Sequence, residues 1–198
     1  MGTGLGGAGW LGLREAYRQA LELGQLDGYQ RRRWQRGEEL AGYLAEGELP
    51  SLSTKQALAL YRASGGRQTE EFQNNPIEEV RDSLDFLLYD AVKLEGRFEE
   101  CASQEGAYKL AGAGKEFVSY LLCLREPTLF AVWSPHCERA LRRLGMYPEG
   151  LRKGKLGMRY MDLLEASESV RRKVGLADFR AVDEFAYAVT RAGARVAR

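Results

Sequence analysis

Hydrophobic residues recur at helical spacing through the first fifty residues of the chain. Two stripes show this spacing: Leu13, Tyr17, Ala20 and Leu21, and then Trp34, Leu40, Tyr43 and Leu44. Apolar positions three or four residues apart predict a helix with one buried face. Glycines over residues 24–28 separate the two stripes and favour a turn. We therefore expect a helical hairpin over residues 10–50, preceded by a glycine-rich flexible leader over residues 1–9.

Residues 51–198 predict further helices and form the second expected unit. Pro76 suits the first position of a helix with an apolar stripe, and the run after Gly114 is apolar on nearly all sides, which is typical of a central helix. Ser134 and Pro135 begin another helix, and two more are expected over residues 156–174 and 178–190. Because no segment alternates with the period of a strand, the predicted fold class is all-α.

The charge changes this picture because it is unevenly distributed. The net charge of the chain is only +1, but residues 70–105 carry eleven acidic and three basic side chains, a net charge of −8. Residues 109–159 carry ten basic and four acidic side chains, a net charge of +6. A basic segment of this kind suits a phosphate backbone. The alternative is that the two segments form a solvated surface and neutralise each other.

Several classes of function lack the residues they need. The three cysteines are widely spaced and the single histidine is His136, so no zinc motif is present, and Glu116 stands where a P-loop needs Ser or Thr. No apolar run is long enough to cross a bilayer, and no basic residue precedes Arg14 to begin a signal peptide. We expect a cytoplasmic protein without a metal, a cofactor or a membrane partner.

The most informative motif is the run Leu110-Ala111-Gly112-Ala113-Gly114 directly before the apolar helix. Two glycines allow a sharp turn between helices, which leaves the amides at the next helix N-terminus free to meet a phosphate. Lys109 and Lys115 flank the turn. The motif predicts a phosphate site at Gly112, Ala113 and Gly114, although many helical proteins use glycine only to connect two helices.

Residues 110–145 resemble the helix-hairpin-helix core of the endonuclease III type of DNA glycosylases. That family has an L-P-G-V-G hairpin, a buried helix, an A-V-D link and another helix. Here residues 130–133 read Phe-Ala-Val-Trp, and the next helix carries Arg139, Arg142 and Arg143. Residues 77–94 would supply an earlier helix of the same module. The resemblance implies a DNA-binding helical domain over residues 51–198.

Both catalytic positions of that family differ here. Trp133 follows Ala-Val where the family has its aspartate, and a shift of one residue brings Ser134 there instead. Glu116 stands in place of the lysine that the bifunctional enzymes use. The four C-terminal cysteines of the iron-sulfur branch are absent because no cysteine follows Cys137. The resemblance therefore implies a form of the module without catalysis.

A looser resemblance is to the N-terminal DNA-recognition domains of modification-dependent restriction systems of the McrBC type. It implies an NTPase and nuclease, in a partner or a fused domain, that act where this module binds. Readers of modified bases often stack an extruded base on aromatic rings. Trp133, Tyr147 and Tyr160 are candidates for such a base pocket, together with His136, and core packing is the alternative for each aromatic residue.

Our leading hypothesis is a noncatalytic module that binds double-stranded DNA and recognises modified or damaged bases for a restriction or repair system. The hairpin amides would hold phosphate, and charge would come from Lys109, Lys115, Arg139, Arg142, Arg143, Lys153 and Lys155. One alternative is an active DNA glycosylase whose acid lies elsewhere, for example at Asp162 or Asp178. Another is a helical interaction protein that presents the acidic face of residues 70–105 to a basic partner.

Overall fold

The computed structural model describes residues 7–149 and 154–192, and this part of the chain is helical without any strand. The first elements are α1 (Gly7–Glu22), α2 (Asp27–Arg33), α3 (Gly37–Gly42), the 3-10 turn η1 (Leu49–Ser51), α4 (Thr54–Ala63) and α5 (Thr69–Gln73). The others are α6 (Ile77–Tyr89), α7 (Leu94–Ala102), α8 (Lys115–Arg125), α9 (Pro135–Arg143), α10 (Leu156–Val174) and α11 (Phe179–Ala192). The all-α prediction is confirmed.

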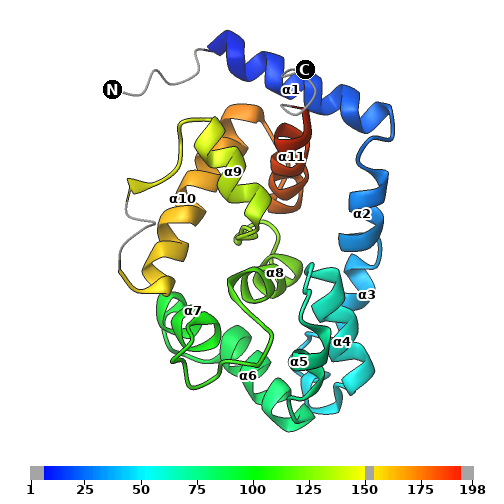
Figure 1. The fold of residues 1–198 in the computed structure, drawn as a ribbon, viewed down its shortest axis with the longest axis vertical. Helices are drawn as coiled ribbons and strands as arrows, with labels where there is room; N and C mark the ends of the chain where they lie inside the picture. The colour runs from blue at the N-terminus through cyan, green and yellow to red at the C-terminus, as the bar shows by residue number, and fades with distance from the viewer. Residues whose placement is uncertain (1–6, 150–153, 193–198) are drawn as a thin grey trace.

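Helix α8 lies at the centre of the molecule, with α9, α10 and α11 on one side and α4 to α7 on the other (Figure 1). Every residue from Phe117 to Leu124 is buried. A helix surrounded by other helices needs apolar side chains on all faces, whereas a surface helix needs only one apolar stripe. The sequence of α8 therefore predicts its central position correctly.

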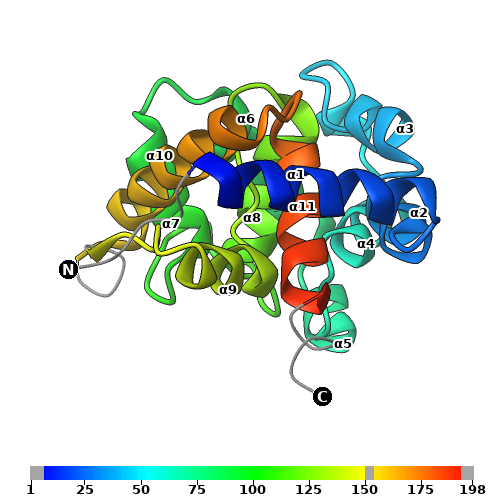
Figure 2. The ribbon, with the colours of Figure 1, turned by 90° about the horizontal axis from the view of Figure 1, so that it is seen from above.

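The N-terminal helices spread over the body of the molecule. Helix α1 packs against α10 and α11 and crosses above them, while α3 packs against α4 and α8 (Figure 2). Trp10, Tyr17 and Leu40 belong to the same hydrophobic cluster as the side chains of α8. The boundary expected at residue 50 thus lies within one continuous core. Of the expected leader, residues 7–9 form the start of α1, and the rest lies outside the described residues.

Local sequence signals explain where several helices begin and end. Ser53 and Gln56 form a capping box at α4, since each side chain bonds the backbone amide of the other residue. The Ser134 hydroxyl accepts a hydrogen bond from the amide of Cys137 and caps α9, with Pro135 at its first position. Helix α10 ends at Val174, and Gly175 caps it in the left-handed conformation (φ 75°).

The three cysteines are buried and unpaired with one another. Burial raises the pKa of Cys101 and of Cys137 to about 12, so both thiols are protonated near neutral pH. Within the described residues, no group of histidine, cysteine and acidic side chains is arranged to hold a metal ion. None of the described helices is both long and apolar enough to cross a membrane.

Candidate functional site

The glycine hairpin over residues 110–114 is held firmly by the helices that surround it. Gly112 has φ +71°, and a Cβ there would lie 2.8 Å from the carbonyl oxygen of Gln68, so glycine is required on both counts. The Asn75 side chain accepts from the amide of Ala111 (2.8 Å) and donates to its carbonyl (3.1 Å). The Tyr61 hydroxyl donates to the carbonyl of Gly112 (2.8 Å).

Lys109 is turned toward the hairpin itself. Its ammonium group donates to the carbonyls of Leu110 and Ala113, and burial lowers its pKa. The positive charge therefore compensates backbone carbonyls of the turn. The phosphate contact predicted for Lys109 would have to compete with these internal bonds.

Gly114 provides the N-cap of α8 without a side-chain cap. Its backbone is extended (φ −158°, ψ −169°), and a Cβ there would meet nothing within 4 Å. The first amides of a helix carry partial positive charge and attract anions when no side chain bonds them. Gly114 and Glu116 line a cleft, so this end of α8 opens onto it.

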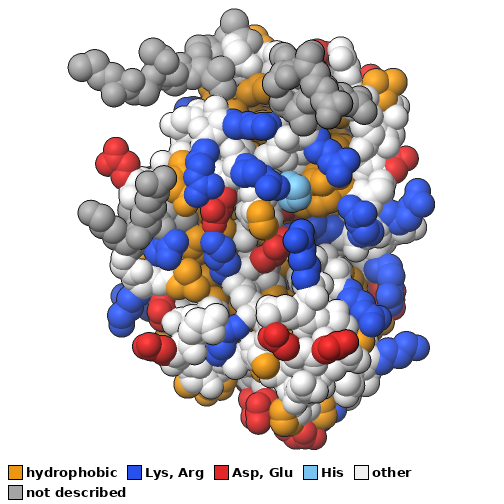
Figure 3. All heavy atoms as spheres, in the orientation of Figure 1, with side chains coloured by type: hydrophobic (Ala, Val, Ile, Leu, Met, Phe, Trp, Pro, Cys, Tyr) orange, Lys and Arg blue, Asp and Glu red, His pale blue; other side chains and the backbone are white. Residues whose placement is uncertain are grey.

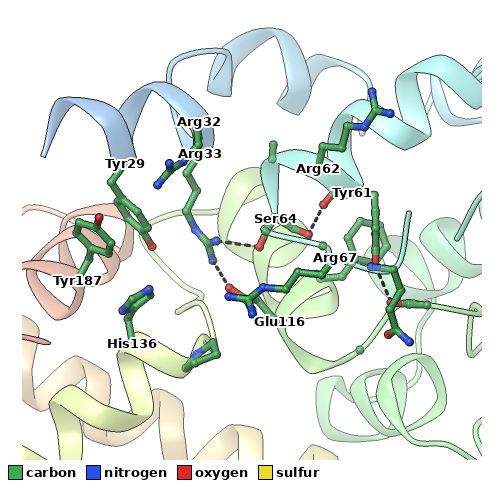
Figure 4. Close-up of a pocket in the computed structure, with 18 of the residues that line it drawn as sticks. Tyr29, Arg32, Arg33, Tyr61, Arg62, Ser64, Arg67, Glu116, His136 and Tyr187 are labelled. Atoms are coloured by element: carbon green, nitrogen blue, oxygen red, sulfur yellow. Dashed lines mark hydrogen bonds and ion pairs between the residues drawn. The ribbon is translucent and has the colours of Figure 1, made fainter. Parts of the chain in front are cut away.

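This cleft, which we call the arginine cleft, has a volume of about 630 Å³. It lies between α2, α4, the segment of residues 64–68 and the starts of α8 and α9 (Figure 4). Among the lining residues that the structure describes, five are arginines: Arg32, Arg33, Arg62, Arg67 and Arg139. Glu116 is the one carboxylate among the described lining residues. Figure 3 shows basic side chains gathered on this face around the single histidine.

The rim of the cleft is strongly basic. Arg32, Arg62 and Arg67 are exposed. Among the residues that the structure describes, no carboxylate lies within ion-pair distance of these three guanidinium groups. No direct ion pair therefore neutralises these three charges, although Arg67 acts electrostatically on Glu116, and such a concave basic surface concentrates anions.

The floor of the cleft is a buried ion-pair network around Arg33, which is only 5% exposed. Its guanidinium group pairs with Asp183 (Nε to Oδ2, 2.9 Å) and with Glu116 (Nη2 to Oε1, 3.2 Å). It also donates to the carbonyl of Ser64 (2.8 Å). The Tyr29 hydroxyl donates to Asp183 Oδ2 (2.7 Å), so one oxygen of the buried carboxylate takes part in both a hydrogen bond and the ion pair with Arg33.

Glu116 differs from Asp183 because it faces the cleft. Its side chain is 29% exposed, whereas that of Asp183 is fully enclosed. Burial raises the pKa of Glu116, and the positive charges of Arg33 and Arg67 oppose that rise. Glu116 is thus a carboxylate with a perturbed pKa in a concave site, which is a common property of functional residues.

Aromatic rings line one end of the cleft. Tyr29 stacks on Tyr187 with ring centres 4.0 Å apart, and His136 meets Tyr187 edge-on at 4.9 Å. Burial lowers the pKa of His136, and the positive charge of Arg139 lowers it further. Arg139 Nη2 lies 3.0 Å from His136 Nδ1. The Thr190 hydroxyl lies 3.1 Å from the same nitrogen, so two side chains hold this edge of the ring.

The structure brings together only part of the predicted DNA-binding set. Gly112, Gly114 and Arg139 line the arginine cleft, and Ala113 is buried beside it in the hairpin. These positions combine the glycine turn with the start of α9. The hairpin therefore borders the arginine cleft, and its role in binding stays a prediction.

Other predicted basic residues are occupied elsewhere. Lys115 pairs with Glu138 (Nζ to Oε1, 2.5 Å), and Arg142 pairs with the same carboxylate (Nη2 to Oε2, 3.1 Å). Arg143 donates to the carbonyl of Val189 (2.7 Å). Lys155 is exposed at the N-cap of α10, and Lys153 lies outside the described residues.

The prediction that Trp133, Tyr147 and Tyr160 line a base pocket does not agree with the structure. Trp133 and Tyr160 have no exposed surface and lie in the core; the indole N–H donates to Glu138 (2.7 Å) and the Tyr160 hydroxyl to the carbonyl of Ala131 (2.9 Å). Tyr147 is half-buried beneath Arg142. None of the three is among the described lining residues of the cleft. Only His136 is, and the cleft instead presents Tyr29, Tyr61, Phe117 and Tyr187.

The two carboxylates considered as relocated acids also lie away from the cleft. Neither Asp162 nor Asp178 is among its described lining residues, and Asp178 accepts from the amide of Ala181 (2.9 Å) at the start of α11. Of the described carboxylates, Glu116 lines the cleft, and Asp183 is buried beneath it in an ion pair with Arg33. The sequence around Asp183 does not indicate that its carboxylate will form a buried ion pair, because its partner Arg33 lies far away along the chain.

Comparison with known protein families, with curated proteins and with solved structures finds no match for this chain. Its function therefore has to be argued from the arginine cleft and the hairpin beside it.

Proposed function

We propose that the protein is a noncatalytic DNA-binding module that holds backbone phosphates at the hairpin and at the rim of the arginine cleft. The observation that carries the proposal is the meeting of unpaired rim arginines with the uncapped start of α8. Both features stabilise phosphate, the first through full charge and the second through oriented backbone amides. The resemblance of residues 110–145 to a DNA-binding helix-hairpin-helix supports the same assignment.

The shape of the cleft favours recognition of a single unstacked nucleotide. Its volume of about 630 Å³ falls within the range of roughly 300 to 1,000 Å³ that is typical of small-molecule sites. Tyr29 and Tyr187 lie at one end with small parts of their rings exposed (7% and 6%), and arginines form the rim. A modified or damaged base extruded from duplex DNA would fit such a site, and in that role the module would direct a separate NTPase and nuclease.

The test compares two charge-reversal variants with the same net charge. Arg62→Glu with Arg67→Glu removes two rim arginines, while Lys55→Glu with Lys93→Glu reverses two exposed lysines outside the cleft. Fluorescence anisotropy with a labelled duplex across a salt series measures both affinity and its salt dependence. Each lost phosphate contact should reduce the slope of log K against log salt by roughly 0.9, so the rim variant should lose about two contacts and the control none.

Equal loss of affinity in the two variants would show that only total charge matters and would remove the cleft from the interface. If the unmodified protein fails to bind duplex DNA even at low salt, the proposal is wrong. That result would favour the interaction protein that presents the acidic face of residues 70–105.

The rival function is base excision, and the observation that favours it is the position of Glu116 in the cleft. Glycosidic cleavage develops positive charge on the sugar, which a nearby carboxylate stabilises. Here the ion pair with Arg33 already compensates Glu116, so we expect no excision from duplexes containing uracil, 8-oxoguanine or alkylated purines. Denaturing gels after alkali treatment detect cleaved strands. Cleavage that persists through purification and disappears in Glu116→Gln would make the protein a glycosylase.

A further inference from the structure

We propose that the arginine cleft selects a guanine-type base, with the Glu116 carboxylate accepting hydrogen bonds from the two adjacent N–H groups of its Watson–Crick edge. This inference rests on the proposed function, because it assumes that the cleft receives a nucleotide. It adds the chemical class of that nucleotide and a residue that determines specificity.

The first step of the argument is the hydrogen-bonding capacity of Glu116. An ionised carboxylate offers about four acceptor sites, and Arg33 Nη2 uses one of them on Oε1. In the described part of the chain, no hydrogen bond reaches Oε2. The side chain is 29% exposed toward the cleft, so a ligand there meets a carboxylate with most of its capacity unused.

The second step is the surroundings of Glu116, which restrict what it can bind. The rim arginines Arg62 and Arg67 repel a cationic ligand, although an ammonium or guanidinium group is otherwise the simplest partner of a carboxylate. The ligand must therefore be anionic where it meets the rim and carry uncharged N–H donors where it meets Glu116. A nucleotide has this division of chemistry, with phosphate at one end and a base edge at the other.

The third step distinguishes the bases by their donor patterns. Guanine presents its ring N1–H and its exocyclic amine side by side, which matches the two parallel acceptors of a carboxylate. Adenine and cytosine place a ring nitrogen acceptor beside the amine, and its lone pair opposes Glu116. Thymine and uracil place one N–H between two carbonyl oxygens. Bidentate pairs of this kind contribute about 1 to 3 kcal/mol of discrimination between bases.

Arg33 acts here as a positioning residue. It holds Oε1 of Glu116 at 3.2 Å and is itself fixed by Asp183 and by the carbonyl of Ser64. Its guanidinium group also favours the ionised form of Glu116, the form that can accept both hydrogen bonds. The acceptor is thus oriented before any ligand arrives, which reduces the entropy cost of binding.

The experiment compares two nucleotides that differ by one group. Isothermal titration calorimetry on the full chain measures the affinity of 2′-deoxyguanosine 5′-monophosphate and of its inosine analogue, which lacks the exocyclic amine. We expect the guanine nucleotide to bind at least about fivefold more tightly, with the adenine, cytosine and thymine nucleotides weaker still. The ratio is measured on the unmodified protein, so it needs no variant to fold.

The variant Glu116→Gln tests the residue assignment. An amide presents one acceptor and one donor, so it opposes one N–H of guanine. We expect Glu116→Gln to lower guanine nucleotide affinity at least about tenfold and to abolish the preference over inosine. Glu126→Gln is the matched control at the other end of α8, where the side chain lies outside the cleft, and it should retain the preference.

The outcomes separate this inference from the proposed function. Equal affinity for the guanine and inosine nucleotides, or no measurable binding of the guanine nucleotide at millimolar concentration, overturns the guanine selectivity while salt-dependent duplex binding still supports a DNA-binding module. A guanine preference that survives in Glu116→Gln overturns the assignment of Glu116. If the unmodified protein binds neither the guanine nucleotide nor duplex DNA, both proposals are wrong.

Discussion

Replacement of Arg33 by methionine removes the cation on which the floor of the arginine cleft depends. Methionine keeps most of the length of the arginine stem but neither its charge nor its donors. Asp183, which is 2% exposed, then keeps the Tyr29 hydroxyl at 2.7 Å and the Ser134 hydroxyl at 3.4 Å as donors. Two neutral hydroxyls do not neutralise a buried charge, so the folded state should be strongly destabilised.

The expected loss of folding free energy follows from the contacts that Arg33→Met removes. Breaking a buried ion pair by removal of one partner costs about 3 to 5 kcal/mol, and Asp183 meets that condition. Glu116 adds less because its side chain is partly exposed and water can solvate it. With a loss of about 4 kcal/mol, and about 2 to 4 °C per kcal/mol for a domain of this size, Tm should fall by about 8 to 16 °C.

Thermal unfolding followed by circular dichroism at the helical band measures this change. Arg36→Met is the control, since Arg36 bonds Glu39 in a pair that is exposed on both sides and its removal should leave Tm almost unchanged. The double variant Arg33→Met with Asp183→Asn should recover part of the loss, because neither buried charge remains. A fall in Tm no larger than that of the Arg36 control, or a double variant as unstable as the sum of the single ones, would refute the reasoning.

Two further predictions concern the hairpin and the response to pH. Gly112→Ala should lower Tm because its Cβ would lie 2.8 Å from the carbonyl oxygen of Gln68, whereas Gly114→Ala, with open space around its Cβ, should fold normally in thermal melts. The pKa of Glu116 is raised in the folded protein, so folding favours its protonated form and stability falls as pH rises through that pKa. Loss of Arg33 raises this pKa further; the Tm deficit of Arg33→Met should therefore shrink between about pH 7 and about pH 5, and a constant deficit would contradict the role of the ion pair.

Helix positions were predictable because their signals are local. The expected helix over residues 156–174 has the same bounds as α10, and the helix expected over 178–190 corresponds to α11 within two residues. Ser134 caps α9 as its sequence predicts. Capping residues and apolar periodicity act within a few residues, so the helix bounds that they set depend little on tertiary packing.

The fate of the aromatic residues was not predictable from local pattern. A polar residue directly follows both Trp133 and Tyr29, yet Trp133 is fully enclosed while Tyr29 lines the cleft. Trp133 is enclosed because Phe98 and Tyr160, from α7 and α10, lie against it. These contacts join segments far apart in the chain. A local sequence pattern does not show which distant helix will pack against an aromatic ring.

The three adjacent arginines of α2 show that local sequence also fails to predict which charged residue is buried. Arg31 and Arg32 are exposed, as charged residues usually are, but Arg33 is buried with Tyr29 one helical turn before it. Its burial is tolerated because Asp183 from α11 pairs with it. Glu116, from the start of α8, is a second partner of the same guanidinium group. Neither the sequence around Arg33 nor that around Glu116 indicates this pairing, because the two residues come together only when α2 packs beside α8.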